Sequence, residues 1–131
     1  MEVSIVKPYE PFACLYKEEC HLLDEAKTKI RKLLLGMKKL TNENNKKLLI
    51  VLIPAEFQSN RNARVKYLPI PLTSLEKDYP YVEISAFFQK NDIDYLDLRQ
   101  AFRAGDQVGY FKKDDHWNYK GHQIAAEAIS V

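Results

Sequence analysis

Glycine is scarce in this sequence of 131 residues: there are four glycines, and none lies between Gly36 and Gly105. A catalytic serine at the end of a strand needs a sharp turn and nearby oxyanion donors, and the glycine-framed Gly-x-Ser-x-Gly motif is absent. Ser59 is the only serine that soon follows the end of a predicted strand. Without glycines to build such a turn, Ser59 is interpreted as an ordinary loop residue.

Cysteine is also rare, with Cys14 and Cys20 as the only two. Six residues apart, they could form a local disulfide or remain two free thiols. A zinc site would need two more well-spaced Cys or His ligands, and the neighbouring His21 completes no known zinc spacing. The sequence therefore favours unpaired or purely structural thiols over a metal site.

Long apolar runs and a strong net charge are missing as well. No apolar run approaches the ~20 residues of a membrane-spanning helix. A formal net charge of +2 gives no large field to attract nucleic acid. The N-terminus lacks the basic start and apolar run of a signal peptide, which leaves the compartment unknown. With 46% hydrophobic and 29% charged residues, residues 1–131 are expected to form a single α/β domain or the C-terminal portion of one.

A long helix is predicted from near Lys17 to about Leu40, after a short strand at residues 3–6. The apolar residues of this helix recur at three- and four-residue steps and form one stripe. They are Leu23, Ala26, Ile30, Leu33, Leu34, Met37 and Leu40. Basic residues occupy much of the remainder. Because no aromatic residues are interleaved with them, they are interpreted as a solvated face and not as a polyanion-binding surface.

The middle of the chain has a strand, helix, strand, helix pattern. Six consecutive apolar residues at 48–53 predict a strand that is buried on both faces, as in the centre of a parallel sheet. A long loop with room for one short helix covers 55–79, and a helix is predicted from Pro80 to about Lys90. A short strand at 93–98 and one helical turn at 99–103 follow. This order predicts a right-handed crossover in a parallel sheet.

Residues 114–129 combine an acid, an imidazole and the only tryptophan, and then begin a helix. The spacing Asp114-x-His116 can place a carboxylate beside an imidazole and fix its tautomer, as a general base requires. Asn118 is a good N-cap for the helix. His116 is therefore expected on the loop before a helix N-terminus, where α/β enzymes often hold catalytic groups. On spacing alone, a surface histidine would be the more frequent interpretation.

This block resembles the last sequence block of the SGNH (GDSL-type) hydrolase superfamily. It is most similar to the branch with an Asp-x-His-Trp signature, which includes polysaccharide O-acetyltransferases of the alginate-modifying kind. The matching positions are Asp114, His116, Trp117, Asn118, Gly121, His122, Ala125 and Ala126. Residues 48–54 and 92–98 resemble two of the family's strands, so the resemblance covers roughly residues 47–131.

The resemblance implies that His116 is the general base for a serine hydroxyl and that Asp114 orients it. Asp115 is chemically equivalent, but the spacing of the signature selects Asp114. Trp117 could bind substrate, and it could equally be a packing anchor under the last helix. His122 is expected to be structural. A metal site made of these acids and histidines matches no known ligand spacing, so neither a metal nor a cofactor is expected.

The chain also departs from the family. The nucleophilic serine of the family lies in a Gly-Asp-Ser-like motif on the first strand, and two further blocks supply a Gly and an Asn as oxyanion donors. None of these is present here. The chain is therefore expected to be the C-terminal segment of an SGNH-type serine esterase or O-acyltransferase. The implied fold is a three-layer, flavodoxin-like parallel sheet that is incomplete at its N-terminal side.

This interpretation makes the chain inactive by itself, with a small-molecule or carbohydrate ester such as an O-acetylated sugar as the substrate of the parent enzyme. An exposed sheet edge would favour self-association. The alternative is a catalytically silent binding or interaction module that keeps the SGNH-like fold.

Overall fold

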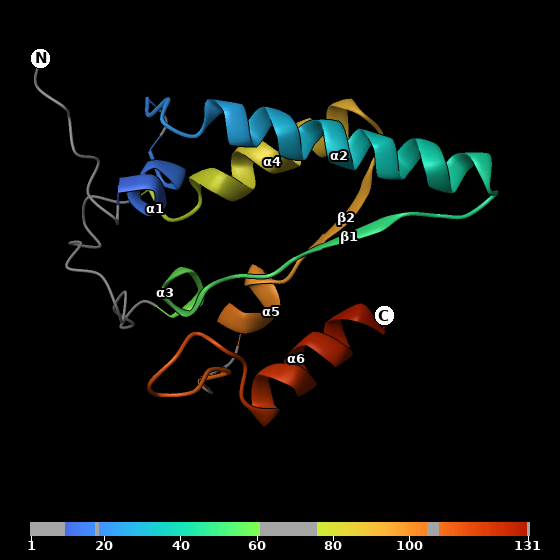
Figure 1. The fold of residues 1–131 in the computed structure, drawn as a ribbon. Coiled ribbons are helices and arrows are strands. Elements are labelled where there is room, and N and C mark those ends of the chain that lie inside the picture. Colours follow the sequence, from blue (N-terminus) through green and yellow to red (C-terminus); the bar gives the residue numbers. More distant parts are fainter. Residues whose placement is uncertain (1–9, 18, 61–75, 105–107, 131) are drawn as a thin grey trace, which may run out of the picture.

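The computed structural model describes residues 10–17, 19–60, 76–104 and 108–130. Figure 1 shows the elements in chain order. They are α1 (Glu10–Leu15), α2 (Asp24–Glu43), β1 (Leu49–Leu52), α3 (Glu56–Ser59), α4 (Tyr79–Lys90), β2 (Asp94–Asp97), α5 (Arg99–Arg103) and α6 (Tyr119–Ile129). The strand predicted at residues 3–6 lies outside the described residues.

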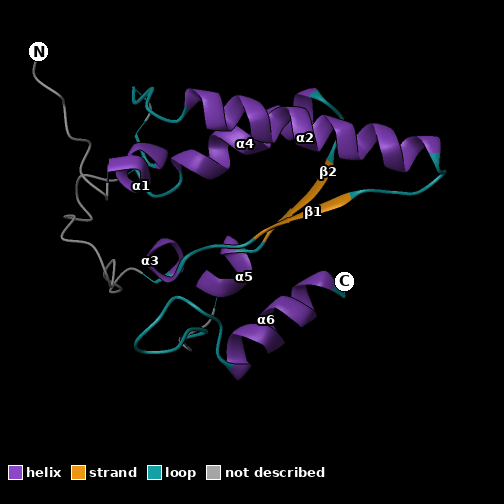
Figure 2. Cartoon of the chain, viewed as in Figure 1, coloured by secondary structure: helices purple, strands orange, loops and turns teal. Residues whose placement is uncertain are grey.

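The two strands form a parallel sheet with α4 as the connection between them. Leu49 is opposite Asp94, and Leu52 is opposite Asp97. Within the described residues the sheet consists of these two strands. Figure 2 shows α2 and α4 on one side of the sheet and α6 on the other. The mixed α/β fold and the predicted helix between two parallel strands are thus confirmed.

The expectation that the first strand is buried on both faces is wrong for the described residues. Leu49 at the start of β1 is 53% exposed, and Ile53 just after it is 60% exposed. A two-stranded sheet is too narrow for its helices to cover an apolar strand on both sides along its whole length. Val51, in contrast, packs against the main apolar cluster.

The expectation of unpaired thiols is also wrong, because Cys14 and Cys20 form a disulfide. Their Cα atoms are 5.3 Å apart, whereas six residues of continuous α-helix would span about 9 Å. The chain therefore turns between α1 and α2. As a result, α2 begins at Asp24 and not near Lys17, and it extends past Leu40 to Glu43.

No residue of α2 is buried, and charged residues lie on the side of α2 that packs against α4. Lys27 and Arg31 face α4 and form ion pairs with Glu83 at 2.8 and 2.6 Å. Four members of the predicted apolar stripe are 47–68% exposed: Ile30, Leu33, Met37 and Leu40. Part of the basic surface therefore serves helix packing, which corrects its interpretation as a purely solvated face.

Two apolar clusters hold the other elements together. The larger one contains Leu98, Phe102, Tyr110 and Ala125, which join α5 and α6 to the strands. The smaller one joins α1 to α3, with Tyr16 and Phe57 at its centre and Phe12 packed against them. Among the described residues, no helix is long and apolar enough to cross a membrane.

A pair of glycines sets how closely α6 approaches the preceding loop. A Cβ atom added to Gly121 would lie 2.1 Å from the backbone oxygen of Gly109. Real side chains cannot come so close without a shift of the backbone. Gly121 therefore allows the first turn of α6 to pack directly on the chain that leads into the Asp-x-His-Trp segment.

Candidate functional site

The loop before α6 is held at both ends by hydrogen bonds. Asn118 caps the helix as predicted, because its side-chain oxygen accepts from the backbone N–H groups of Lys120 and Gly121 at 2.9 and 3.1 Å. Its amide nitrogen donates to the carbonyl oxygen of Tyr110 at 3.0 Å. Tyr110 and Trp117 form an isolated antiparallel bridge. Residues 111–116 therefore project as a closed loop with a fixed base.

Asp114 and His116 point toward each other on this loop. One carboxylate oxygen of Asp114 accepts from the backbone N–H of His116 at 2.9 Å. The same oxygen lies 3.4 Å from Nδ1 of the imidazole. The side chain of His116 is 87% exposed and that of Asp114 46%. The pair therefore lies at the surface, in a geometry where the acid can bias the tautomer of the histidine.

Asp115 lies on the exposed side of the loop, but its charge reaches two buried phenols. Burial, together with the negative charge of Asp115, raises the pKa of Tyr16 to about 12. Burial also raises the pKa of Tyr110, and so do the negative charges of Glu56 and Asp115. Hydrogen bonds to this phenol lower its pKa by less, so the pKa stays above its usual value. The loop therefore lies close to both aromatic clusters.

Trp117 makes extensive packing contacts. Its ring stacks on Phe102 with centroids 5.3 Å apart, and it meets the ring of His122 edge-on at 5.6 Å. Trp117 also packs against the larger apolar cluster. These contacts are those of an anchor beneath the loop, and Trp117 as a whole is half-buried.

The phenol of Tyr110 connects the loop to the sheet. Its hydroxyl donates to the carbonyl oxygen of Pro54, just after β1, at 2.5 Å. Ser59 is near this contact, but its hydroxyl donates to the carbonyl oxygens of Glu56 and Ala55 at 3.1 and 3.5 Å. Ser59 belongs to the short helix α3, so its assignment to a loop is corrected.

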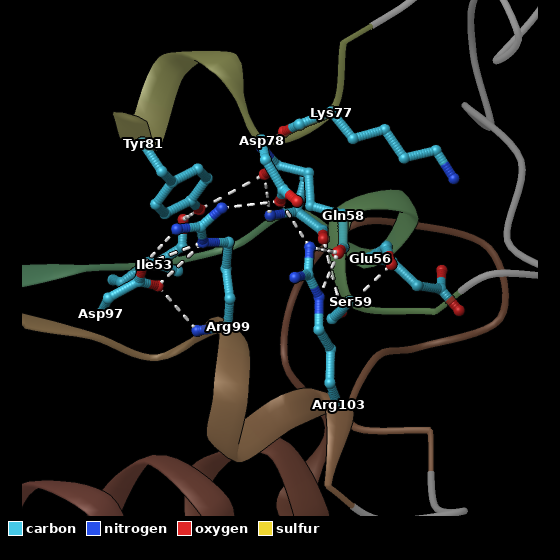
Figure 3. Close-up of polar contacts among 11 residues, drawn as sticks. Ile53, Glu56, Gln58, Ser59, Lys77, Asp78, Tyr81, Asp97, Arg99 and Arg103 are labelled. Atoms are coloured by element: carbon cyan, nitrogen blue, oxygen red, sulfur yellow. Dashed lines mark hydrogen bonds and ion pairs between the residues drawn. The ribbon is translucent and has the colours of Figure 1, made fainter. Parts of the chain in front are cut away.

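Sequence reasoning missed a network of charges at the carboxyl ends of the two strands, shown in Figure 3. Arg99 contacts Asp97 at 2.5 Å and Asp78 at 2.6 Å. Arg103 contacts the same oxygen of Asp78 at 2.6 Å and donates to the carbonyl oxygen of Gln58. Burial pushes the pKa of Asp78 up, but hydrogen bonds from Arg103 and Arg99 outweigh it, so the pKa lies below its usual value.

This network fixes the start of α4 and the end of β2 relative to α3. The guanidinium of Arg99 also lies over the ring of Tyr81, 4.1 Å from its centroid. The sequence contained one signal for this network, namely the polar residues that follow each of the two predicted parallel strands. In the part of the chain that the structure describes, no three His, Cys, Asp or Glu side chains are grouped as metal ligands would be.

The described residues thus form a mixed α/β domain with a parallel βαβ unit, and the Asp114–His116 pair lies on the loop before α6. A family model described as the SGNH hydrolase-like domain of acetyltransferase AlgX matches residues 15–131, and the chain therefore belongs to this family. The predicted SGNH resemblance is confirmed by this match. Comparisons with curated proteins and with solved structures found no match to the chain.

Proposed function

We propose that this chain supplies the general base and the orienting acid of an SGNH-type serine acyl-transfer site. His116 would take the proton from a serine hydroxyl and return it to the leaving group, while Asp114 would hold the imidazole in the required tautomer. The observation that carries this proposal is the 3.4 Å contact between Nδ1 of His116 and the Asp114 carboxylate. Membership of the SGNH hydrolase-like family supports it.

The nucleophile would come from a Gly-Asp-Ser-type strand, which these 131 residues do not contain. Ser59 is a poor substitute because its hydroxyl is directed to the backbone of its own helix. We therefore propose that the chain corresponds to the C-terminal segment of a three-layer, flavodoxin-like domain. The half-exposed apolar strand β1 supports this, since further strands would bury it.

The substrate proposed for such a site is a carbohydrate carrying an acetyl ester, because the family description names an acetyltransferase. The acetyl group would form an acyl-enzyme on the serine and then pass to water or to another hydroxyl. Trp117, which is half-buried and follows His116 in the sequence, is proposed to contact the sugar.

The alternative is a catalytically silent binding module. The 87% exposure of the His116 side chain favours it, because a working base usually lies in a cleft that excludes water. The coding sequence upstream of Met1 separates the two proposals. An in-frame Gly-Asp-Ser strand would support the acyl-transfer site, whereas its absence would support the silent module.

The activity test uses 4-nitrophenyl acetate. We expect the 131-residue chain to show no turnover above background, and His116→Ala to leave that background unchanged. In a longer reading frame with the Gly-Asp-Ser strand, His116→Ala should reduce turnover by about a thousandfold or more. Strong turnover by the 131-residue chain that is abolished by Ser59→Ala would overturn this assignment of the site.

A further inference from the structure

A cavity of about 220 Å³ lies at the carboxyl end of β1, apart from the Asp–His pair. Its apolar lining comes from Leu52 on β1 and from Pro80 and Ile84 on α4. Tyr16 and Tyr81 contribute aromatic rings to it. None of the described residues that line this cavity carries a charge at neutral pH, so this lining is unsuited to an ionic ligand.

Most polar groups around the cavity already have partners within the protein. The hydroxyl of Tyr81 donates to the carbonyl oxygen of Ile53 at 2.8 Å. The side-chain oxygen of Gln58 accepts from the backbone N–H of Ala55 at 2.8 Å, and its nitrogen donates to the carbonyl oxygen of Lys77 at 3.1 Å. A ligand with many hydroxyl groups would therefore find few free partners here.

The hydroxyl of Tyr16 is the exception. Tyr16 is 6% exposed, and its ring is fixed by Phe12 and Phe57, with ring centroids 5.1 and 5.2 Å from that of Tyr16. Among the described residues, no group forms a hydrogen bond with this hydroxyl, and the Tyr16 phenol is near enough to Tyr81 to raise the pKa of Tyr81. Burial raises the pKa of Tyr16 to about 12, so it remains a donor at neutral pH.

We propose that this cavity binds the acyl part of a neutral ester, with the carbonyl oxygen accepting from the Tyr16 hydroxyl. The aliphatic part would contact Leu52, Pro80 and Ile84. At roughly 30 Å³ per water-sized unit, the volume holds about seven heavy atoms, which corresponds to an acyl group of up to about five carbons. The choice of an ester rests on the proposed acyl-transfer function, whereas the cavity and the Tyr16 hydroxyl, which is unbonded among the described residues, are observed independently of that function.

The test measures binding of ethyl butyrate to the 131-residue chain by NMR, without any turnover. We expect saturable shifts of the side-chain amide of Gln58 and of the Ile84 methyl groups, with a Kd in the millimolar range for so small a ligand. Tyr16→Phe keeps the ring and removes the hydroxyl, so it should weaken binding by about threefold or more. Ile84→Trp should fill the cavity and abolish the shifts.

Tyr119→Phe is the matched control, because it also removes a tyrosine hydroxyl but at a residue that is 79% exposed and lies at the start of α6. This substitution should not change the affinity for ethyl butyrate. An absence of saturable shifts in the unmodified chain would refute the cavity as a binding site. Equal affinity of Tyr16→Phe would refute the role of the hydroxyl. Equally strong binding of butyrate anion or of methyl glucoside at the same residues would refute the preference for a neutral ester. None of these results depends on His116, so they leave the proposed base untouched.

Discussion

The orientation of a single imidazole determines whether Asp114 can act as an orienting acid. A carboxylate next to Nδ1 favours the tautomer that carries its proton there, which leaves Nε2 free to accept a proton from a nucleophile. In the unmodified chain, the Asp114 oxygen is 3.4 Å from Nδ1 of His116. This geometry favours the Nδ1–H form of the neutral ring.

Replacement of Asp114 by Asn tests this arrangement. We expect the neutral ring of His116 to shift from mostly Nδ1–H toward the Nε2–H form, as read from the ¹⁵N chemical shifts of the ring nitrogens. Asp115→Asn is the control, and it should leave the tautomer unchanged because the Asp114 carboxylate makes the contact. An identical response to both substitutions would contradict the assignment of Asp114.

Asp78 gives a second prediction at the residue scale, in this case for stability. Its folded-state pKa is lowered by Arg103 and Arg99, so its charge stabilises the native state above the unfolded pKa of about 4. This stabilising contribution is lost as the pH falls through the lowered folded-state pKa of Asp78. Because Asp78 is 52% exposed, we expect Asp78→Asn to destabilise by only about 1 kcal/mol at pH 7.

The difference between Asp78→Asn and the unmodified chain should shrink as the pH is lowered from 5 to about 2, as measured by urea unfolding. Asp94→Asn provides a matched control on the exposed start of β2 and should change stability little at any pH. A loss of stability from Asp78→Asn that is the same at all pH values would show that packing, and not charge, is responsible.

At the scale of elements, the contact of α6 with the preceding loop depends on the absence of a side chain at Gly121. Gly121→Ala would place a Cβ atom 2.1 Å from the backbone oxygen of Gly109, so we expect a loss of about 2 kcal/mol or more. Gly36→Ala on α2 is the natural comparison, because its Cβ atom would meet nothing within 4 Å. There the better helix propensity should stabilise by about 0.5–1 kcal/mol. Both variants can be compared by thermal unfolding. Similar changes in stability for the two would contradict the close contact between Gly121 and Gly109.

Elements with local signals were predictable from the sequence. Pro80 marked the first turn of α4, Asn118 marked the cap of α6, and the alternating residues near 94–97 marked β2. The proximity of Asp114 to His116 was also local, because only Asp115 separates them in sequence. Each of these features depends on residues within a few positions of one another.

Features that depend on distant parts of the chain were not predictable. Glu83 on another helix pairs with Lys27 and Arg31 of α2, and the apolar periodicity of α2 could not indicate this contact. Asp78 and Arg99 are 21 positions apart and meet because the start of α4 lies next to the end of β2. The disulfide was equally hidden, since the spacing of two cysteines does not reveal their pairing.

At the scale of the whole molecule, the sheet has two strands within the described residues, so each of these strands is an edge strand there. We expect the chain to self-associate through such an edge, seen in light scattering as an apparent mass that rises with concentration. The substitutions Leu49→Lys and Ile53→Lys should suppress association without unfolding the chain, because these two side chains are 53% and 60% exposed.

Leu33→Lys is the matched control for self-association, because Leu33 is 68% exposed but lies on α2, away from the strands. It should leave association unchanged. If Leu33→Lys suppressed association and the two strand substitutions did not, the interface would lie on α2. A monomer at every concentration of the unmodified chain would exclude self-association.

The Cys14–Cys20 bond joins α1 to the turn before α2 and closes a small ring of backbone between them. A ring of this size contributes roughly 2 kcal/mol by restricting the unfolded chain. Because α1 is also held to α3 by the aromatic contacts of Tyr16 with Phe57, cleavage by a thiol would loosen the turn between α1 and α2 and leave α1 in place. The bond thus restrains how freely the chain moves between these two helices, and the attachment of α1 to the rest of the protein depends on the aromatic contacts.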